Sequence, residues 1–205
     1  MILWTIQTEE VYETIQKTGV YHCDSFRSFL TDCKIQYDWL VSQMIKRIGD
    51  KPTGVEYPVW AWYQWEGERK KPDLRSERWG NGWKGDRFAC MEIDIPEQDV
   101  LLSDFDLWSI MLNNGLLSET EEESIELEKK YNLLSEQKKW EMKSKNWEGV
   151  FDLSPLENGW IIRGDSIQAT FWELRIDQIR SVRMFTSASP KPEYLENENP
   201  FDINC

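Results

Sequence analysis

The sequence contains few of the residues that mark common catalytic and metal sites. It has one histidine, His22, and four cysteines without a C-x-x-C pair, so the usual histidine–carboxylate and thiolate metal sets are missing. It also has no glycine-rich phosphate-binding loop and no acyl-transfer elbow. These absences exclude the enzyme classes that short motifs identify.

Long apolar runs are missing as well. No stretch reaches the ~20 apolar residues needed to span a bilayer, and the N-terminal run lacks the basic flank and apolar length of a signal peptide. A chain of 205 residues is long enough to bury a core without a disulfide framework. We therefore expect no membrane insertion, no export, and free thiols in a reducing cytoplasm.

Positive charge is scarce overall but concentrated in one segment. The formal net charge of −13 disfavours a general nucleic-acid binder, because such proteins cover phosphates with lysine and arginine. The segment Arg69–Arg87, however, contains seven basic residues and three acidic ones. We expect this segment either to be a solvated loop or to contact a phosphate, a protein or a nucleic acid through Arg69, Lys70, Lys71 and Arg75.

Tryptophan is abundant, with 12 residues spread along nearly the whole chain. Some must lie in the core, and others offer stacking faces for a base, a nicotinamide or a sugar. The densest run, Tyr57–Trp65 (YPVWAWYQW), is typical of a strand. Alternation places Val59, Ala61, Tyr63 and Trp65 on one face, and Trp60, Trp62 and Gln64 on the other.

The remaining pattern predicts a single α+β domain over residues 1–186, followed by an acidic, proline-containing tail over 187–205. A charged helical insertion is expected at about 118–146, either as one helix or as two joined near Asn132. Other helices are expected from Thr8 to Gly19, over Phe26–Ile48, and from a Ser103 cap through Leu112. Strands are expected at Ile2–Gln7, Tyr57–Trp65, Phe88–Ile95, Gly149–Leu153, Trp160–Arg163 and Ile167–Leu174, with a loop or ragged hairpin at Glu66–Asp86.

Four strings resemble a family of bacterial and phage proteins catalogued as a domain of unknown function. They are Leu3–Gln7 (LWTIQ), Tyr57–Trp65, Leu101–Trp108 (LLSDFDLW) and Gln168–Trp172 (QATFW). The resemblance covers about residues 2–186, and it implies family membership rather than an activity.

The order of elements is also similar to the ADP-ribosyltransferase superfamily. A first strand, a short helix ending in glycine, a long helix, an aromatic strand, the strand Glu92–Pro96 (EIDIP) and a late strand opening with Gln-Ala carry this resemblance. It implies a split antiparallel β-sheet with flanking helices that holds NAD, without a metal, in a central cleft. In that family a polar or basic residue of the first strand contacts the nucleotide, an aromatic or hydroxyl residue of the second strand stacks on nicotinamide, and a late-strand glutamate orients the ribose. The corresponding residues are Thr5 or Gln7, Trp62 or Tyr63, and Gln168 with Thr170.

This chain departs from the family at the late strand. Where a Gln-x-Glu pattern supplies the catalytic carboxylate, the sequence has Gln168-Ala169-Thr170, and the nearest carboxylate, Glu173, falls on the opposite face. A neutral amide binds a ribose hydroxyl, but it supplies no negative charge to a developing oxocarbenium ion.

Two functions therefore stay open. One is an ADP-ribosyltransferase-like domain, with glycosyltransferase chemistry if it is an enzyme, that binds NAD or a related nucleotide and modifies a protein or nucleic acid. The other is a non-enzymatic recognition module, related to phage or host defence, that grips a macromolecule through its tryptophans and basic segment. An aromatic sugar-binding platform also fits the tryptophans.

Overall fold

The computed structural model describes residues 1–23, 33–156 and 163–191. Six strands form one antiparallel sheet in the order β5-β6-β3-β1-β4-β8, and β2 pairs with β7 in a separate ribbon. The strands are β1 (Ile2–Thr8), β2 (Val20–His22), β3 (Val59–Gln64), β4 (Arg87–Asp94), β5 (Leu101–Asp104), β6 (Ile167–Phe171), β7 (Glu173–Arg175) and β8 (Ile179–Thr186). The helices are α1 (Glu9–Thr18), α2 (Lys34–Ile48), α3 (Leu74–Gly80), α4 (Phe105–Leu112), α5 (Glu121–Asn132) and α6 (Glu136–Asn146). The predicted α+β class, with an antiparallel sheet and flanking helices, is confirmed.

A hydrophobic cluster covers each face of the sheet. On one face, Ile15 of α1 packs with Leu3, Met91 and Phe171, all of which are essentially unexposed. On the other face, α2, α4 and the 3₁₀ helix η3 (Trp147–Phe151) bury a second cluster around Trp108. Because side chains alternate along a strand, Ala61 belongs to the first face and Trp60 to the second.

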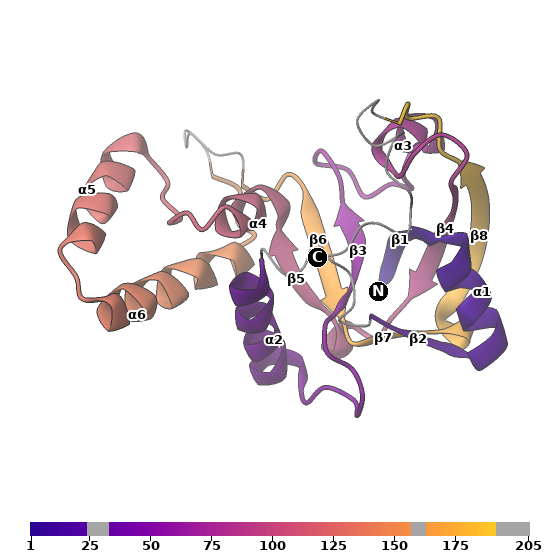
Figure 1. Ribbon diagram of the computed structural model, residues 1–205, viewed down its shortest axis with the longest axis horizontal. Coiled ribbons are helices and arrows are strands. Elements are labelled where there is room, and N and C mark those ends of the chain that lie inside the picture. The colour runs from indigo at the N-terminus through magenta and orange to yellow at the C-terminus, as the bar shows by residue number, and fades with distance from the viewer. Residues whose placement is uncertain (24–32, 157–162, 192–205) are drawn as a thin grey trace.

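The two charged helices α5 and α6 form an arm at the end of the molecule beyond β5 and α4, whereas α1 lies at the opposite end (Figure 1). No residue of α5 is buried, which agrees with its imperfect apolar stripe. The break between the helices falls after Asn132, so the alternative of two joined helices is confirmed for this stretch.

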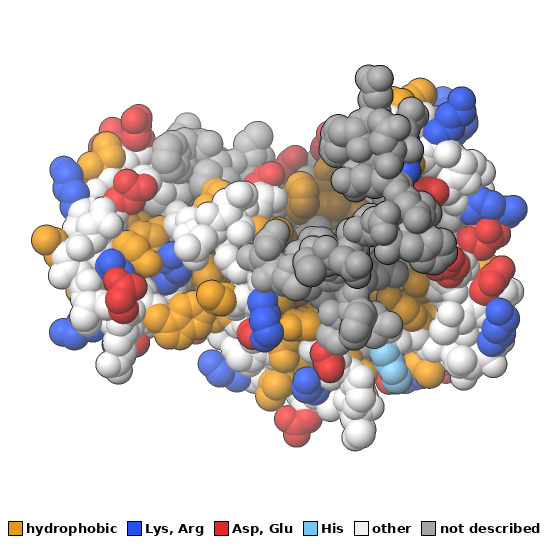
Figure 2. All heavy atoms as spheres, in the orientation of Figure 1, with side chains coloured by type: hydrophobic (Ala, Val, Ile, Leu, Met, Phe, Trp, Pro, Cys, Tyr) orange, Lys and Arg blue, Asp and Glu red, His pale blue; other side chains and the backbone are white. Residues whose placement is uncertain are grey.

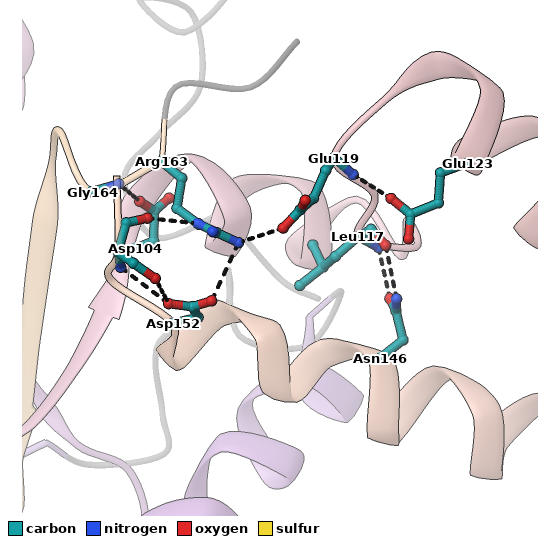
Figure 3. Close-up of polar contacts among 9 residues, drawn as sticks. Asp104, Leu117, Glu119, Glu123, Asn146, Asp152, Arg163 and Gly164 are labelled. Carbon is teal, nitrogen blue, oxygen red and sulfur yellow. Dashed lines mark hydrogen bonds and ion pairs between the residues drawn. The ribbon is translucent and has the colours of Figure 1, made fainter. Parts of the chain in front are cut away.

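Arg163 connects the arm to the body of the domain (Figure 3). Its guanidinium contacts Glu119 at 2.9 Å and Asp152 at 3.4 Å, and its side chain is 14% exposed. Beside it, the Asp104 carboxylate accepts hydrogen bonds from the backbone N–H groups of Leu107 and Gly164. Asp104 therefore caps α4 and also fixes the segment that enters β6.

The capping prediction was wrong by one residue, because Asp104 rather than Ser103 is the N-cap of α4. Ser103 belongs to β5, where it lies opposite Gln168. The predicted strand at Gly149–Leu153 was also wrong, since the 3₁₀ helix η3 covers most of it. Trp147 and Val150 are both fully buried, and their three-residue spacing suits a helical turn better than a strand.

The predicted loop at Glu66–Asp86 contains helix α3, so that prediction was wrong in its middle. The Asp73 carboxylate accepts a hydrogen bond from the Arg75 backbone N–H and starts the helix. No residue of α3 is buried, which explains why the sequence shows no apolar periodicity there.

Some predictions fall outside the described residues. These are the start of the helix predicted at Phe26–Ile48, most of the strand predicted at Trp160–Arg163, and most of the tail. Within the described ranges, no helix is both long and apolar enough to cross a bilayer.

Candidate functional site

Within the six-stranded sheet, β1 and β3 share the fewest registered pairs, and we call this junction the split. Strand β1 pairs with β4 along its whole length, from Ile2 opposite Asp94 to Thr8 opposite Phe88, but it is registered with β3 at one pair, Trp4 opposite Trp62. The Thr5 hydroxyl bridges the split by donating to the Trp60 carbonyl oxygen at 2.7 Å. The strands therefore meet at one point and leave space beside it.

A pocket of about 300 Å³ occupies this space. Its walls come from β1, β3, β6 and α3, through Trp4, Ile6, Gln7, Trp60, Ala61, Trp62, Glu77, Gly80, Asn81 and Gln168. Register explains how distant residues meet here, since Trp62 lies opposite both Trp4 on β1 and Gln168 on β6. Figure 2 shows hydrophobic side chains at the bottom of a hollow beside α3.

Three buried polar atoms of residues in this wall have no hydrogen-bond partner within residues 1–23, 33–156 and 163–191. They are the indole nitrogens of Trp4 and Trp60 and the amide oxygen of Gln168. A fourth, the Ser103 hydroxyl, lies on the strand next to Gln168. Leaving a buried polar group without a partner costs roughly 1–3 kcal/mol, and most such groups in proteins are satisfied. Residues of the pocket wall thus include two N–H donors and one carbonyl acceptor that are closed to solvent and have no partner within the described part of the chain.

A second pocket of about 240 Å³ adjoins the first. It is lined by Trp62, Trp65, Glu66, Lys70, Lys71, Pro72, Asp73, Ser76 and Glu77, so Trp62 and Glu77 belong to both pockets. The Trp62 ring is held edge-on by Trp65 at 4.6 Å and Phe105 at 5.1 Å between centroids. We call the two pockets together the groove. Its floor has a fixed aromatic ring where they join.

Helix α3 forms the outer wall of the groove, and the segment after β8 holds it in place. The Ala188 N–H donates to the Arg78 carbonyl oxygen at 2.8 Å, and the Ser189 hydroxyl donates to the Trp79 carbonyl oxygen at 2.5 Å. Ser189 is itself buried. The described start of the predicted tail therefore packs against α3.

The structure brings together three of the six residues predicted for the site. Gln7, Trp62 and Gln168 all line the larger pocket. Thr5 is buried and serves as the bridge to β3. Among the described residues, the other two face elsewhere. Thr170 is buried, with its hydroxyl donating to the Leu101 carbonyl oxygen, whereas Tyr63 lies under the Arg69 guanidinium at 3.9 Å.

The predicted basic residues have different surroundings. Arg69 donates to the Ile2 carbonyl oxygen at 2.7 Å, Lys70 pairs with Glu68, and Arg75 pairs with Asp73. Hydrogen bonds from Arg75 lower the pKa of Asp73 to about 2. Lys71 lines the smaller pocket and forms no ion pair with any described residue.

Glu77 is the site residue that the sequence reasoning missed. It is the one carboxylate in the wall of the larger pocket, among the residues that the structure describes. The Asn81 side-chain amide donates to Glu77 Oε2 at 2.9 Å and so orients the carboxylate. The available sequence signal was weak: an Asp73 cap followed four residues later by Glu77, within a segment of alternating charges.

The fold and groove define an α+β domain with a six-stranded antiparallel sheet and a tryptophan-lined cavity where β1 meets β3. A family profile described as "Domain of unknown function (DUF3841)" matches residues 2–180, and the chain belongs to that family. The predicted membership is thereby confirmed. Comparisons with the curated proteins and with the solved structures found no match.

Proposed function

We propose that this protein is an ADP-ribosyltransferase-like domain that binds NAD, or a related nucleotide, in the groove and modifies a protein or nucleic acid. The observation that carries the proposal is the set of unpartnered atoms at the larger pocket, Trp4 Nε1, Trp60 Nε1 and Gln168 Oε1. A carboxamide accepts hydrogen bonds through its oxygen and donates through its nitrogen. The nicotinamide end of NAD therefore offers a partner to both kinds of group, and binding would require these side chains to turn toward the pocket, since each atom is closed to solvent.

The two pockets also suit the two chemical ends of the ligand. An aromatic ring in the larger pocket has tryptophan faces on which to stack. The phosphates would extend into the smaller pocket toward Lys71, which has no ion pair with a described residue. Lys70 is paired with Glu68, and the carboxylates of Glu66, Asp73 and Glu77 also line this pocket. Each pocket is at or below the lower end of the common ligand-site range of roughly 300–1,000 Å³, so a dinucleotide requires both.

The order of strands gives further support. The resemblance to ADP-ribosyltransferases assigns roles to a first strand, an aromatic second strand and a late strand. The matching strands here, β1, β3 and β6, are neighbours in the sheet. Gln7, Trp62 and Gln168 are consequently the residues expected to contact nucleotide, in place of Thr5, Tyr63 and Thr170.

Titration of the full chain with NAD tests this proposal through tryptophan fluorescence. We expect saturable quenching that is weakened by Trp62→Ala and by Gln168→Ala. Trp140→Ala is the control, because Trp140 lies on the arm, is 45% exposed and does not line the groove. If wild-type protein shows no quenching and no binding by calorimetry at about 1 mM NAD, the proposal is wrong.

A recognition module is the second candidate, favoured by exposed tryptophans around α3. Trp79 is 65% exposed, and Trp65 and Trp83 are each 39% exposed. Large exposed aromatic side chains are typical of interaction surfaces. This candidate expects a captured macromolecular partner whose binding is weakened by Trp79→Ala and Lys71→Glu but not by Gln168→Ala. Loss of the partner with Gln168→Ala alone would count against it.

A further inference from the structure

Glu77 occupies the junction of the two pockets that form the groove. It lines both of them, as does Trp62, and it comes from α3 rather than from the sheet. If a dinucleotide places its ring in the larger pocket and its phosphates near the lysines, the ribose between them lies at this junction. A carboxylate at this junction would then lie near the sugar carbon that carries the ring.

The surroundings of the Glu77 carboxylate leave one of its two oxygens open to the groove. Asn81 occupies Oε2, whereas Oε1 accepts no hydrogen bond from the residues that the structure describes. None of the lining residues of the larger pocket is lysine or arginine. Asn81 thus holds one oxygen of the Glu77 carboxylate, and the other oxygen is open to the groove. There it would stabilise a developing positive charge in a partly desolvated site.

We infer that Glu77 is the catalytic carboxylate of this domain, supplied by α3 in the place where the late strand carries the neutral Gln168. This inference rests on the proposed nucleotide binding and extends it from binding to chemistry. The substrate class is a nucleotide with a cationic pyridinium ring on C1 of ribose. Gln168 positions the ring or the ribose, and Glu77 stabilises the oxocarbenium-like transition state.

The reaction with water balances without an oxidant, a reductant or a metal. The bond between ribose C1 and the pyridinium nitrogen breaks, and its electron pair goes to that nitrogen, which becomes neutral. A bond forms between C1 and a water oxygen, and one proton is released. The products are nicotinamide and ADP-ribose, and an acceptor group on a macromolecule would replace the water in a transfer reaction.

The test measures NAD binding and nicotinamide release separately on the full chain. Glu77→Gln keeps the size of the side chain and its contact with Asn81 while it removes the charge. We expect its dissociation constant for NAD to stay within about twofold of wild type, while the release rate, followed by chromatography, falls about 100-fold or more. Glu68→Gln is the matched control, since Glu68 is a nearby carboxylate that pairs with Lys70 and lines neither pocket.

Each outcome decides the inference. Wild-type turnover in Glu77→Gln, or an equal loss in Glu68→Gln, overturns the role of Glu77 and leaves nucleotide binding intact. Wild-type protein that binds NAD but releases no nicotinamide overturns it too. Absence of NAD binding overturns both this inference and the proposed function. Thermal unfolding of each variant shows whether a loss of turnover comes from a loss of folded protein.

Discussion

Thr5 is a sensitive position because its side chain reinforces the one registered pair between β1 and β3, Trp4 opposite Trp62. Its hydroxyl donates to the Trp60 carbonyl oxygen at 2.7 Å and accepts from the Gln7 side-chain amide at 2.9 Å. The Thr5 residue is 1% exposed. Thr5→Val keeps the shape of the side chain but leaves the Trp60 carbonyl and the Gln7 amide without this partner.

The cost follows from these contacts. A buried polar group that loses its partner costs about 1–3 kcal/mol, and here Gln7 is only partly buried, so we expect about 2 kcal/mol in total. For a chain of this length, each kcal/mol corresponds to a fall in melting temperature of roughly 2–4 °C. Thr5→Val is therefore expected to unfold about 4–8 °C below wild type.

The assay is calorimetric unfolding, paired with hydrogen exchange of the β3 amides. Thr14→Val is the matched control, because its hydroxyl bonds the Glu10 carbonyl oxygen on an exposed face of α1, where we expect a change within about 0.5 kcal/mol. If Thr5→Val unfolds with wild-type stability, or if Thr14→Val loses as much, the hydroxyl is not what joins the two strands at the split.

Two further predictions concern other parts of the fold. Burial raises the pKa of the Cys90 thiol to about 11, so the folded state keeps a proton that the unfolded chain loses above pH ~9. The contribution of the Cys90 thiol to stability is therefore fully present at neutral pH and is lost between about pH 9 and 11. Denaturant unfolding should show this loss of stability in wild type and a smaller loss in Cys90→Ala. Equal losses in the two proteins would contradict the prediction. Arg163→Met removes the contacts with Glu119 and Asp152 and should lower the free energy of unfolding by about 2 kcal/mol. Proteases should then cleave faster between residues 118 and 146. The control Arg175→Met, at a side chain that is 48% exposed, should leave that cleavage rate unchanged.

The sequence predicted the elements that have strong patterns. Alternation identified β1, β3, β4 and β6, and the charge polarity of 118–146 identified α5 and α6. It also separated the face of Trp60, Trp62 and Gln64 from that of Tyr63, but it did not show which face meets the late strand. The register of Trp62 opposite Gln168 answers that question. Such pairing depends on contacts about a hundred residues apart, which no local pattern contains.

Helix α3 and Glu77 were beyond the reach of the same reasoning. A seven-residue helix without a buried residue has no apolar stripe, and its stability comes from Asp73 and from Ser187–Ser189, which are more than a hundred residues further along the chain. The sequence places the strands of the groove but not the helix that closes it. The sequence pattern therefore points to the late strand alone as the place for a candidate catalytic carboxylate.

The tryptophans themselves distinguish the groove from the core. Trp39, Trp147 and Trp172 are buried, and each indole N–H donates to a backbone carbonyl oxygen, at 3.1, 2.8 and 3.1 Å. Trp4 is buried and Trp60 is partly buried, but their indole nitrogens have no partner among the residues that the structure describes. If all five served only to fill the interior, nothing would separate the two sets, since an unmet donor is equally costly in either place. The unmet donors instead belong to residues that line the larger pocket beside Gln168, although the atoms themselves are closed to solvent. Their clustering at one cavity is the physical reason to treat the groove as a candidate binding site rather than as imperfect packing.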